Sequence, residues 1–460
     1  MLYVTNRLLL ICYVYLTQYE SVIMSYRLNV LVSQNPWWKE PTFIDYKVRD
    51  EYLRILQYLN EPQIIAITGI RRVGKTTTLY KLIEKYISEG FNKDNILFVS
   101  FDEFKKEKIR DIIDEYCLFK KKNLLTDKFV FVFDEIQKVD DWENQLKSIY
   151  DVYKLKGNIK IFISGSESLF IRKRSKESLA GRIYEFKLNP LSFKEYLSFI
   201  NYHYDDIDLY NNELLLKFNE YIISQGFPEL VNQTSKEIIK NYISGIIEKV
   251  IYTDIAIQFK VKDPSALESV IRIISNEPGQ IIDNNRLAKE LELSRQLISN
   301  YLRYLCDSFL VLKLYNFSKN QRKSEIKQKK YYPVVLPSQL IFSDDNLIKS
   351  KIFESIIVNQ LQSSFFWRTS QQDEVDIIIV NNKIIPIEVK YGKIETNGIL
   401  KFLTKFNLDK GYIISYKEEK IITQIVNVRE GTGVVKKVEK TIYVIPAYKF
   451  LLLKDKYLDI

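Results

Sequence analysis

The chain has 460 residues, and at about 100 to 200 residues per domain this length predicts about three domains rather than one core. Hydrophobic residues make up 46% and charged residues 27%, proportions typical of folded proteins, which argues against wholesale disorder. The formal charge is +10, from 68 Lys and Arg against 58 Asp and Glu, and this modest excess permits a polyanionic partner without identifying one.

The cysteines and the single histidine limit the kinds of site that the chain can hold. Cys12, Cys117 and Cys306 form no CxxC pair, which argues against a disulfide framework and a zinc site and favours the reducing cytoplasm. His203 lies in the polar stretch NYHYDD, without a nucleophile motif, so a Ser/His/Asp triad is not expected.

The first 44 residues read as an N-terminal segment that precedes the first predicted domain. The apolar stretch 8–16 is too short to span a bilayer and lacks the small-residue cleavage pattern of a signal peptide, so no membrane association is expected. A second methionine, Met24, precedes a polar stretch. We favour a start there, which would leave residues 1–23 out of the native chain.

Residues 45–190 show the alternation of strands and helices that predicts a parallel sheet. Short β-branched and aromatic runs alternate with helical patterns at 75–87, at 142–153 and from Leu169 onward; the runs are IIAIT, ILFVSF, FVFVFD, IKIFIS and RIYEFKL. Five buried strands with crossover helices imply a doubly wound α/β domain with a parallel sheet.

The string GIRRVGKTT directly follows the first of these strands and runs into a helix, as the GxxxxGK[ST] motif requires. Its two glycines permit backbone conformations that point amides at phosphate oxygens, and the helix N-terminus adds positive dipole charge. The motif predicts the phosphate-binding loop (P-loop) of a P-loop NTPase, made by Gly69, Ile70, Arg71, Arg72, Val73, Gly74, Lys75, Thr76 and Thr77.

Position in the motif predicts a role for each polar side chain of this site. Lys75 should reach the β- and γ-phosphates, Thr76 should bind Mg²⁺, and Thr77 should contact the α-phosphate. The strand FVFVF ends in Asp134 and Glu135 at the carboxyl edge of the sheet. Asp134 is the second candidate Mg²⁺ ligand, and Glu135 is the candidate general base, which favours hydrolysis over binding alone.

Two further residues are candidates for the catalytic machinery. Ser166 follows the strand IKIFIS at the same edge, where its hydroxyl can sense the γ-phosphate, although SGS is also a common turn. Arg182 can stabilise charge on a nucleotide bound by a neighbouring subunit, which requires a homo-oligomer. It can equally be a surface arginine paired with a carboxylate, and Arg71 and Arg72 compete for the same duty.

Helical patterns dominate after residue 190 and predict a helical subdomain at 191–262 and a winged helix at 263–317. In the latter, three helical patterns precede an apolar, hairpin-like run, SFLVLKLYNF. Ser294 can cap a DNA-recognition helix whose reading residues would be Arg295, Gln296 and Asn300. The alternative is a helical bridge that docks two domains.

A lysine-rich connector at 318–348 leads to a second α/β domain at 349–460. Glu354 lies on a predicted helix, Asp376 lies in DEVD before a strand, and alternation puts Glu388 and Lys390 on one face of the strand PIEVKYG. Converging carboxylates can bind Mg²⁺ while the lysine stabilises charge, which are the needs of a nuclease. Glu374 is a competing carboxylate.

Together the motifs resemble the archaeal-type AAA+ ATPases that carry a C-terminal nuclease-like domain. The residues that carry the likeness are ITGIRRVGKTTTL, FVFDEIQ followed by Trp142, ISGSES, LAGR, LNPLSFKEYL and GFPEL. The resemblance implies ATP rather than GTP, and a restriction-endonuclease-like C-terminal fold. Asp376 and the pair Glu388 and Lys390 resemble the PD-(D/E)xK nuclease signature, with Glu354 as the helix-borne acid of resolvase-like members.

These observations predict an Mg²⁺-dependent ATPase coupled to DNA binding or processing. An alternative is a nucleotide-dependent switch that binds a protein partner and carries an inactive nuclease-like domain. An ATP-regulated nuclease and a motor on nucleic acid are further alternatives.

Overall fold

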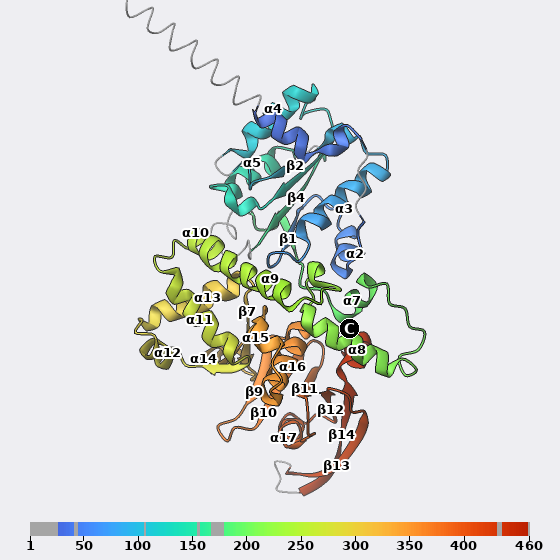
Figure 1. Ribbon diagram of the computed structural model, residues 1–460, viewed down its shortest axis with the longest axis vertical. Coiled ribbons are helices and arrows are strands. Elements are labelled where there is room, and N and C mark those ends of the chain that lie inside the picture. Colours follow the sequence, from blue (N-terminus) through green and yellow to red (C-terminus); the bar gives the residue numbers. More distant parts are fainter. Residues whose placement is uncertain are drawn as a thin grey trace, which may run out of the picture. The chain divides into compact units, whose positions relative to one another are not determined.

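A computed structural model describes residues 26–40, 45–104, 107–153, 157–166, 179–429 and 435–458 (Figure 1). The chain divides into two compact units: the first comprises Met1–Gly69 and Gly74–Leu188, and the second comprises Ile70–Val73 and Asn189–Ile460. Within the described ranges, every helix is too short or too polar to cross a membrane.

The first unit is built on a five-stranded sheet in which all neighbouring strands are parallel, as the sequence predicts. Strands β1 and β3 are buried along their whole length, because helices cover both faces of such a sheet. The strands, in spatial order, are β2 (Ile96–Ser100), β3 (Phe129–Asp134), β4 (Ile159–Gly165), β1 (Ile64–Thr68) and β5 (Ile183–Lys187).

The helices of the first unit include α2 (Asp50–Leu56), α3 (Lys75–Ser88), α4 (Ile109–Lys120) and α5 (Trp142–Tyr153). The predicted helix from Leu169 lies outside the described residues. Part of the predicted N-terminal segment packs on this sheet. Asn35 exchanges two hydrogen bonds of 2.7 and 2.8 Å with the backbone of Phe98. Its side-chain amide thereby pairs with edge strand β2 as a neighbouring strand would.

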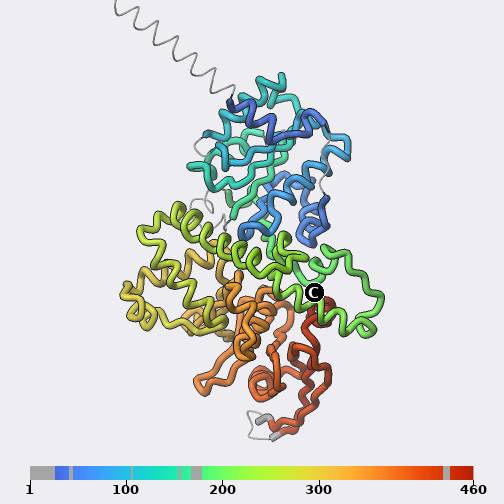
Figure 2. Tube along the Cα trace, in the orientation of Figure 1, coloured from blue at the N-terminus to red at the C-terminus, as the bar shows by residue number. Residues whose placement is uncertain are grey.

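After residue 190 the second unit contains the helices α7 (Phe193–Phe199), α8 (Asn211–Ser224), α9 (Lys236–Lys249), the π-helix η6 (Val250–Ile255) and α10 (Ala256–Gln258). Helix α18 (Ala447–Leu452) packs against α7 and α8, so the end of the chain lies beside these helices (Figure 2). The hydroxyl of Tyr448 donates to Asn211 Oδ1 over 3.0 Å at this contact.

A nine-stranded sheet runs through the rest of the second unit. It contains β6 (Gln280–Ile282), β7 (Val311–Asn316), β8 (Lys329–Pro333), β9 (Phe365–Arg368), β10 (Glu374–Val380), β11 (Ile384–Lys390), β12 (Lys410–Ser415), β13 (Lys420–Arg429) and β14 (Val435–Pro446). The order is β13-β14-β12-β11-β10-β9-β7-β8-β6. Because β7 pairs with β9 in parallel, the strands of the predicted winged helix and of the C-terminal domain form one sheet.

The connector predicted at 318–348 contains regular structure that the sequence analysis missed. The run SFLVLKLYNF forms one strand, β7, rather than a hairpin, and its antiparallel partner is β8. The helices between residues 264 and 341 are α11 (Pro264–Asn276), α12 (Asn284–Glu290), α13 (Arg295–Asp307), α14 (Gln321–Ile326) and α15 (Ser338–Ile341). Of these, α14 and α15 lie in the predicted connector. Strand β8 therefore extends this sheet past residue 317.

Two helices cover opposite faces of the C-terminal strands. Ile377 of β10 belongs to the same buried cluster as Ile356 of α16 (Asn346–Leu361). The next residue, Ile378, belongs instead to a cluster with Phe402 of α17 (Asn397–Phe406). Ile377 and Ile378 therefore point to opposite faces of β10, whose pairing with β9 has a register shift between Val375 and Ile378.

Candidate functional site

The P-loop has the backbone that its glycines predict. Gly69 has φ 148° and Gly74 has φ 97°, values that favour glycine, and helix α3 begins at Lys75 directly afterwards. Arg72 also has a positive φ, 66°. The loop thus turns sharply between β1 and α3, and the N-terminal amides of the helix face the place where phosphate binds in such loops.

Lys75 lies back across this loop. Its side chain is buried, with 6% of the residue exposed, and its Nζ donates to the carbonyl oxygen of Gly69 over 3.0 Å. The ammonium group is therefore held within the loop, where a phosphate oxygen can replace the carbonyl as its partner. Thr77 is exposed in the first turn of α3.

The two predicted Mg²⁺ ligands contact each other. Thr76 Oγ1 donates to Asp134 Oδ2 over 2.8 Å, and the Ser164 hydroxyl donates to the other oxygen, Asp134 Oδ1. Burial raises the pKa of Asp134, and the hydrogen bond from Ser164 opposes this rise. Two oxygen donors on adjacent elements suit Mg²⁺, which takes its remaining ligands from phosphates and water. The described residues contain no cluster of three or more Asp, Glu, His or Cys side chains placed to bind a metal.

Glu135, the predicted base, is positioned by polar neighbours. Its backbone has φ 55°, and its N–H donates to Ser164 Oγ over 3.1 Å. The side-chain amide of Gln137 donates to Glu135 Oε2 over 2.7 Å and to Ser166 Oγ over 3.1 Å. Gln137 therefore joins the predicted base to the predicted γ-phosphate sensor.

Two of these positioning residues were not predicted as site residues. Ser164 and Gln137 lie within the motifs SGSES and FVFDEIQ, but their roles depend on which atoms meet across β3 and β4. The signal in the sequence is that Ser164 lies two residues before Ser166, near the end of strand β4, so its hydroxyl also reaches this edge of the sheet.

The three candidate arginines each pair with a carboxylate. Arg71 makes two bonds of 2.5 Å to Asp254 in the π-helix η6, within the second unit. Arg72 lies 3.3 Å from Glu229 and stacks over Tyr242. Arg182 makes bonds of 2.8 and 3.1 Å to Asp151, which is the surface pairing that the sequence analysis offered as its alternative role.

Arg182 lies at the amino edge of the sheet, because it immediately precedes β5 and its carbonyl accepts the N–H of Ile64 at the start of β1. The P-loop follows the carboxyl end of β1. A strand length thus separates Arg182 from the P-loop of its own chain, so a role towards nucleotide requires a second copy.

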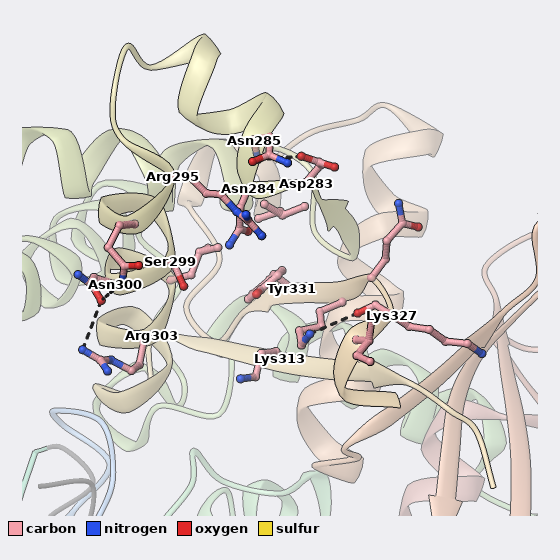
Figure 3. A pocket seen from close by; sticks show the side chains of 16 residues that line it. Asp283, Asn284, Asn285, Arg295, Ser299, Asn300, Arg303, Lys313, Lys327 and Tyr331 are labelled. Carbon is pink, nitrogen blue, oxygen red and sulfur yellow. Dashed lines mark hydrogen bonds between the residues drawn. The ribbon is translucent and has the colours of Figure 1, made fainter. Parts of the chain in front are cut away.

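The predicted DNA-reading residues line a cavity of about 450 Å³, shown in Figure 3. Arg295 and Asn300 of α13 lie on one side, and Lys313 of β7 and Tyr331 of β8 lie on the other. Gln296 of α13 also lines the cavity. Five cationic side chains line this cavity against one acidic side chain, Asp283; the cations are Arg295, Arg303, Lys313, Lys327 and Lys329. We call it the cationic cavity.

The predicted nuclease residues also come together, and a lysine that was not predicted lies among them. The carboxylate cluster consists of Glu354, Glu374, Asp376 and Glu388, and Lys390 binds Glu388 Oε1 over 2.7 Å. Lys330 of β8 forms an ion pair with Glu374, with Glu354 Oε1 at 3.4 Å, and with Asp376 Oδ1 at 3.6 Å. The antiparallel pairing of β10 with β11, which matches Ile377 to Ile387, brings Asp376 beside Glu388.

Burial dominates the electrostatics of this cluster. It raises the pKa of Glu388 to about 7, although Lys390 opposes the rise, and it raises the pKa of Glu354 to about 6 with help from Asp376. Burial lowers the pKa of Lys330, but the negative charge around it raises that pKa well above its usual value overall. Lys330 therefore stays charged at neutral pH.

Three families match parts of the chain: the AAA domain at residues 61–197, and two domains of unknown function, DUF8612 at 215–334 and DUF4143 at 345–431. The uncharacterized protein MJ1544 of Methanocaldococcus jannaschii is 30% identical over an alignment of 359 residues, which covers 73% of this chain and 76% of that protein. An uncharacterized protein of Haemophilus influenzae is 30% identical over 272 residues, 58% of this chain and 66% of its own length.

Among solved structures, the Aeropyrum pernix ORC1 protein in complex with DNA matches with 12% identity and a TM-score of 0.30. The match covers 69% of this chain and 95% of that one. A likeness this low carries no argument about function. The AAA match, by contrast, spans the P-loop, Asp134 and Glu135.

Proposed function

The chain belongs to the family of the Methanocaldococcus jannaschii protein MJ1544 and carries an AAA domain, and we propose that it hydrolyses ATP to ADP and phosphate with Mg²⁺. The observation that carries the proposal is the contact of 2.8 Å between Thr76 Oγ1 and Asp134 Oδ2. This contact supports the proposal, because two oxygen groups that suit Mg²⁺ lie beside a P-loop whose lysine is buried within it.

Each residue then has one task. Lys75 exchanges the Gly69 carbonyl for phosphate oxygens. Thr76 and Asp134 would hold Mg²⁺, which would neutralise phosphate charge when bound. Glu135 accepts the proton of the attacking water, and Gln137 fixes the orientation of its carboxylate.

Removing the P-loop lysine tests the site assignment. Lys75→Ala should abolish ATP binding, measured by equilibrium titration with a fluorescent ATP analogue, and with it phosphate release. Lys85→Ala is the matched control, because Lys85 lies on the same helix and pairs with Glu89 at the surface. Equal ATP affinity in Lys75→Ala and the control would contradict the assignment.

We further propose that elements α11 to β8 form a winged helix and that hydrolysis is coupled to DNA there. The five cations of the cationic cavity support this, because clustered Lys and Arg bind phosphate backbones and Gln or Asn side chains can read bases. The alternative, a switch for a protein partner, predicts hydrolysis that is indifferent to nucleic acid.

The test measures ATP hydrolysis with and without single-stranded, duplex and branched DNA. We expect stimulation by one form, and we expect Arg295→Ala combined with Arg303→Ala to remove it while leaving hydrolysis without DNA intact. Arg286→Ala is the matched control, because Arg286 is exposed on α12 and pairs with Glu290. Hydrolysis that no DNA changes would favour the protein-directed switch.

A further inference from the structure

Strand β8 presents its side chains to two different sites in alternation. Lys329 and Tyr331 line the cationic cavity, whereas Lys330 and Tyr332 point to the carboxylate cluster. Only 4% of Lys330 is exposed, so its ammonium group lies among the carboxylates and not in solvent. The cluster therefore contains a cation that the chain itself supplies.

The contacts of Lys330 use the oxygens that a metal would need. Its Nζ forms an ion pair with Glu374 and lies 3.4 Å from Glu354 Oε1 and 3.6 Å from Asp376 Oδ1. Other donors use the oxygens nearby. Tyr332 donates to Glu354 Oε1 over 2.6 Å, and the Val389 N–H donates to Asp376 Oδ2 over 2.9 Å.

Basic side chains nearly balance the charge of the cluster. Its four carboxylates face three cations: Lys330, Lys390, and Arg368, which lies 3.1 Å from Glu374. A divalent ion added to this arrangement would lie close to the Lys330 ammonium, and like charges repel strongly when both are shielded from water. It would also need several carboxylate oxygens that already accept hydrogen bonds from Lys330, Tyr332 and the Val389 N–H.

We propose that Lys330 is the resident cation of the carboxylate cluster and excludes divalent metal from it. The residues of the predicted nuclease site thus do not fit the Mg²⁺ that phosphodiester cleavage of this type requires. The inference does not depend on ATP hydrolysis, because it concerns only residues of the second unit.

The test measures Mn²⁺ binding by the full chain without nucleotide. Electron paramagnetic resonance reports the concentration of the free ion. All proteins carry Asp134→Asn, which removes a ligand of the ATP site. We expect the Lys330→Met protein to bind one Mn²⁺ at least tenfold more tightly than the protein that retains Lys330. A further Asp376→Asn change should remove this gain. Lys329→Met, on the same strand but facing the other way, should leave Mn²⁺ binding unchanged.

Two results would overturn the proposal. One is Mn²⁺ binding in the protein that retains Lys330, lost on Asp376→Asn. The other is a folded Lys330→Met protein that binds Mn²⁺ no better than its parent. If Lys330→Met does not fold, Lys330→Met with Glu374→Gln removes the ion pair as a unit, and the same gain in Mn²⁺ binding is expected. A folded double variant without that gain would equally overturn it.

Discussion

The proposed nucleotide site and the carboxylate cluster both place a buried lysine beside acidic residues. Lys75 donates to a neutral carbonyl, that of Gly69, whereas Lys330 contacts three carboxylates. A carbonyl gives way to phosphate oxygens without leaving a charge unpaired, but carboxylates do not release a lysine so easily. The partner of the lysine therefore prepares one site for an anion and closes the other to a cation.

The largest expected effect sharpens the chemical side of this comparison. Glu135→Gln should keep ATP binding and slow hydrolysis by about 10²- to 10⁴-fold, because the amide cannot accept a proton from water. Single-turnover phosphate release measures the rate, and titration with a fluorescent ATP analogue measures binding. The control is Glu103→Gln, because Glu103 is exposed whereas Glu143 is buried. Unchanged turnover in Glu135→Gln would assign the base elsewhere.

The second prediction concerns stability. Lys330→Met should lower the free energy of unfolding by about 3 to 5 kcal/mol, because it leaves buried carboxylates without their counter-charge. Lys75→Met removes a lysine whose buried partner at Gly69 is a carbonyl, and we expect it to cost much less. Urea unfolding of both variants gives the difference. Equal losses would show that the two lysines do not differ as the contacts indicate.

The third prediction is a pH dependence. The pKa values of about 7 for Glu388 and about 6 for Glu354 lie above the value of about 4.3 in an unfolded chain. The folded protein therefore binds more protons between these values, and its stability should fall as pH rises from about 5 to about 7.

One group contributes at most about 1.4 kcal/mol per pH unit to this fall. Glu388→Gln should flatten the slope measured by urea unfolding at several pH values. Glu395→Gln, at an exposed carboxylate beside Lys393, should not. A slope that persists in Glu388→Gln would assign the proton uptake to other groups.

The smallest effect is expected at an exposed ion pair. Arg182→Gln should lower the free energy of unfolding by less than about 1 kcal/mol, because water screens the pair of Arg182 with Asp151. Asp151→Asn should give a similar value. A loss as large as that of Lys330→Met would break the distinction between buried and exposed pairs. Hydrolysis by mixtures of Arg182→Gln and parent protein reports separately on a role towards a second copy.

The parallel sheet and the P-loop could be predicted because each follows from local sequence. Buried strands are continuous apolar runs, and the glycines of the P-loop have a required spacing. The network around Glu135 could not be predicted in full, since Gln137 and Ser166 meet only through the pairing of β3 with β4.

Lys330 was missed for a different reason. It lies in the lysine-rich run Lys327 to Lys330, which only Gln328 interrupts, and such charged runs are usually solvated. Strand β8 is five residues long and carries lysines on both faces, so its alternation gives no apolar pattern to recognise. Only its pairing with β7, which sets Leu314 opposite Lys330, shows which lysine is inside.

The alternation of β8 also makes its register matter. A slip of one residue along β7 would turn Lys329 and Tyr331 towards the carboxylates and Lys330 and Tyr332 towards the cationic cavity. A ligand that binds Lys329 and Tyr331 in the cavity therefore also fixes the register of the strand that carries Lys330. A polyanion bound there would stabilise the ion pairs of Lys330 with the carboxylate cluster from the opposite face of the same strand.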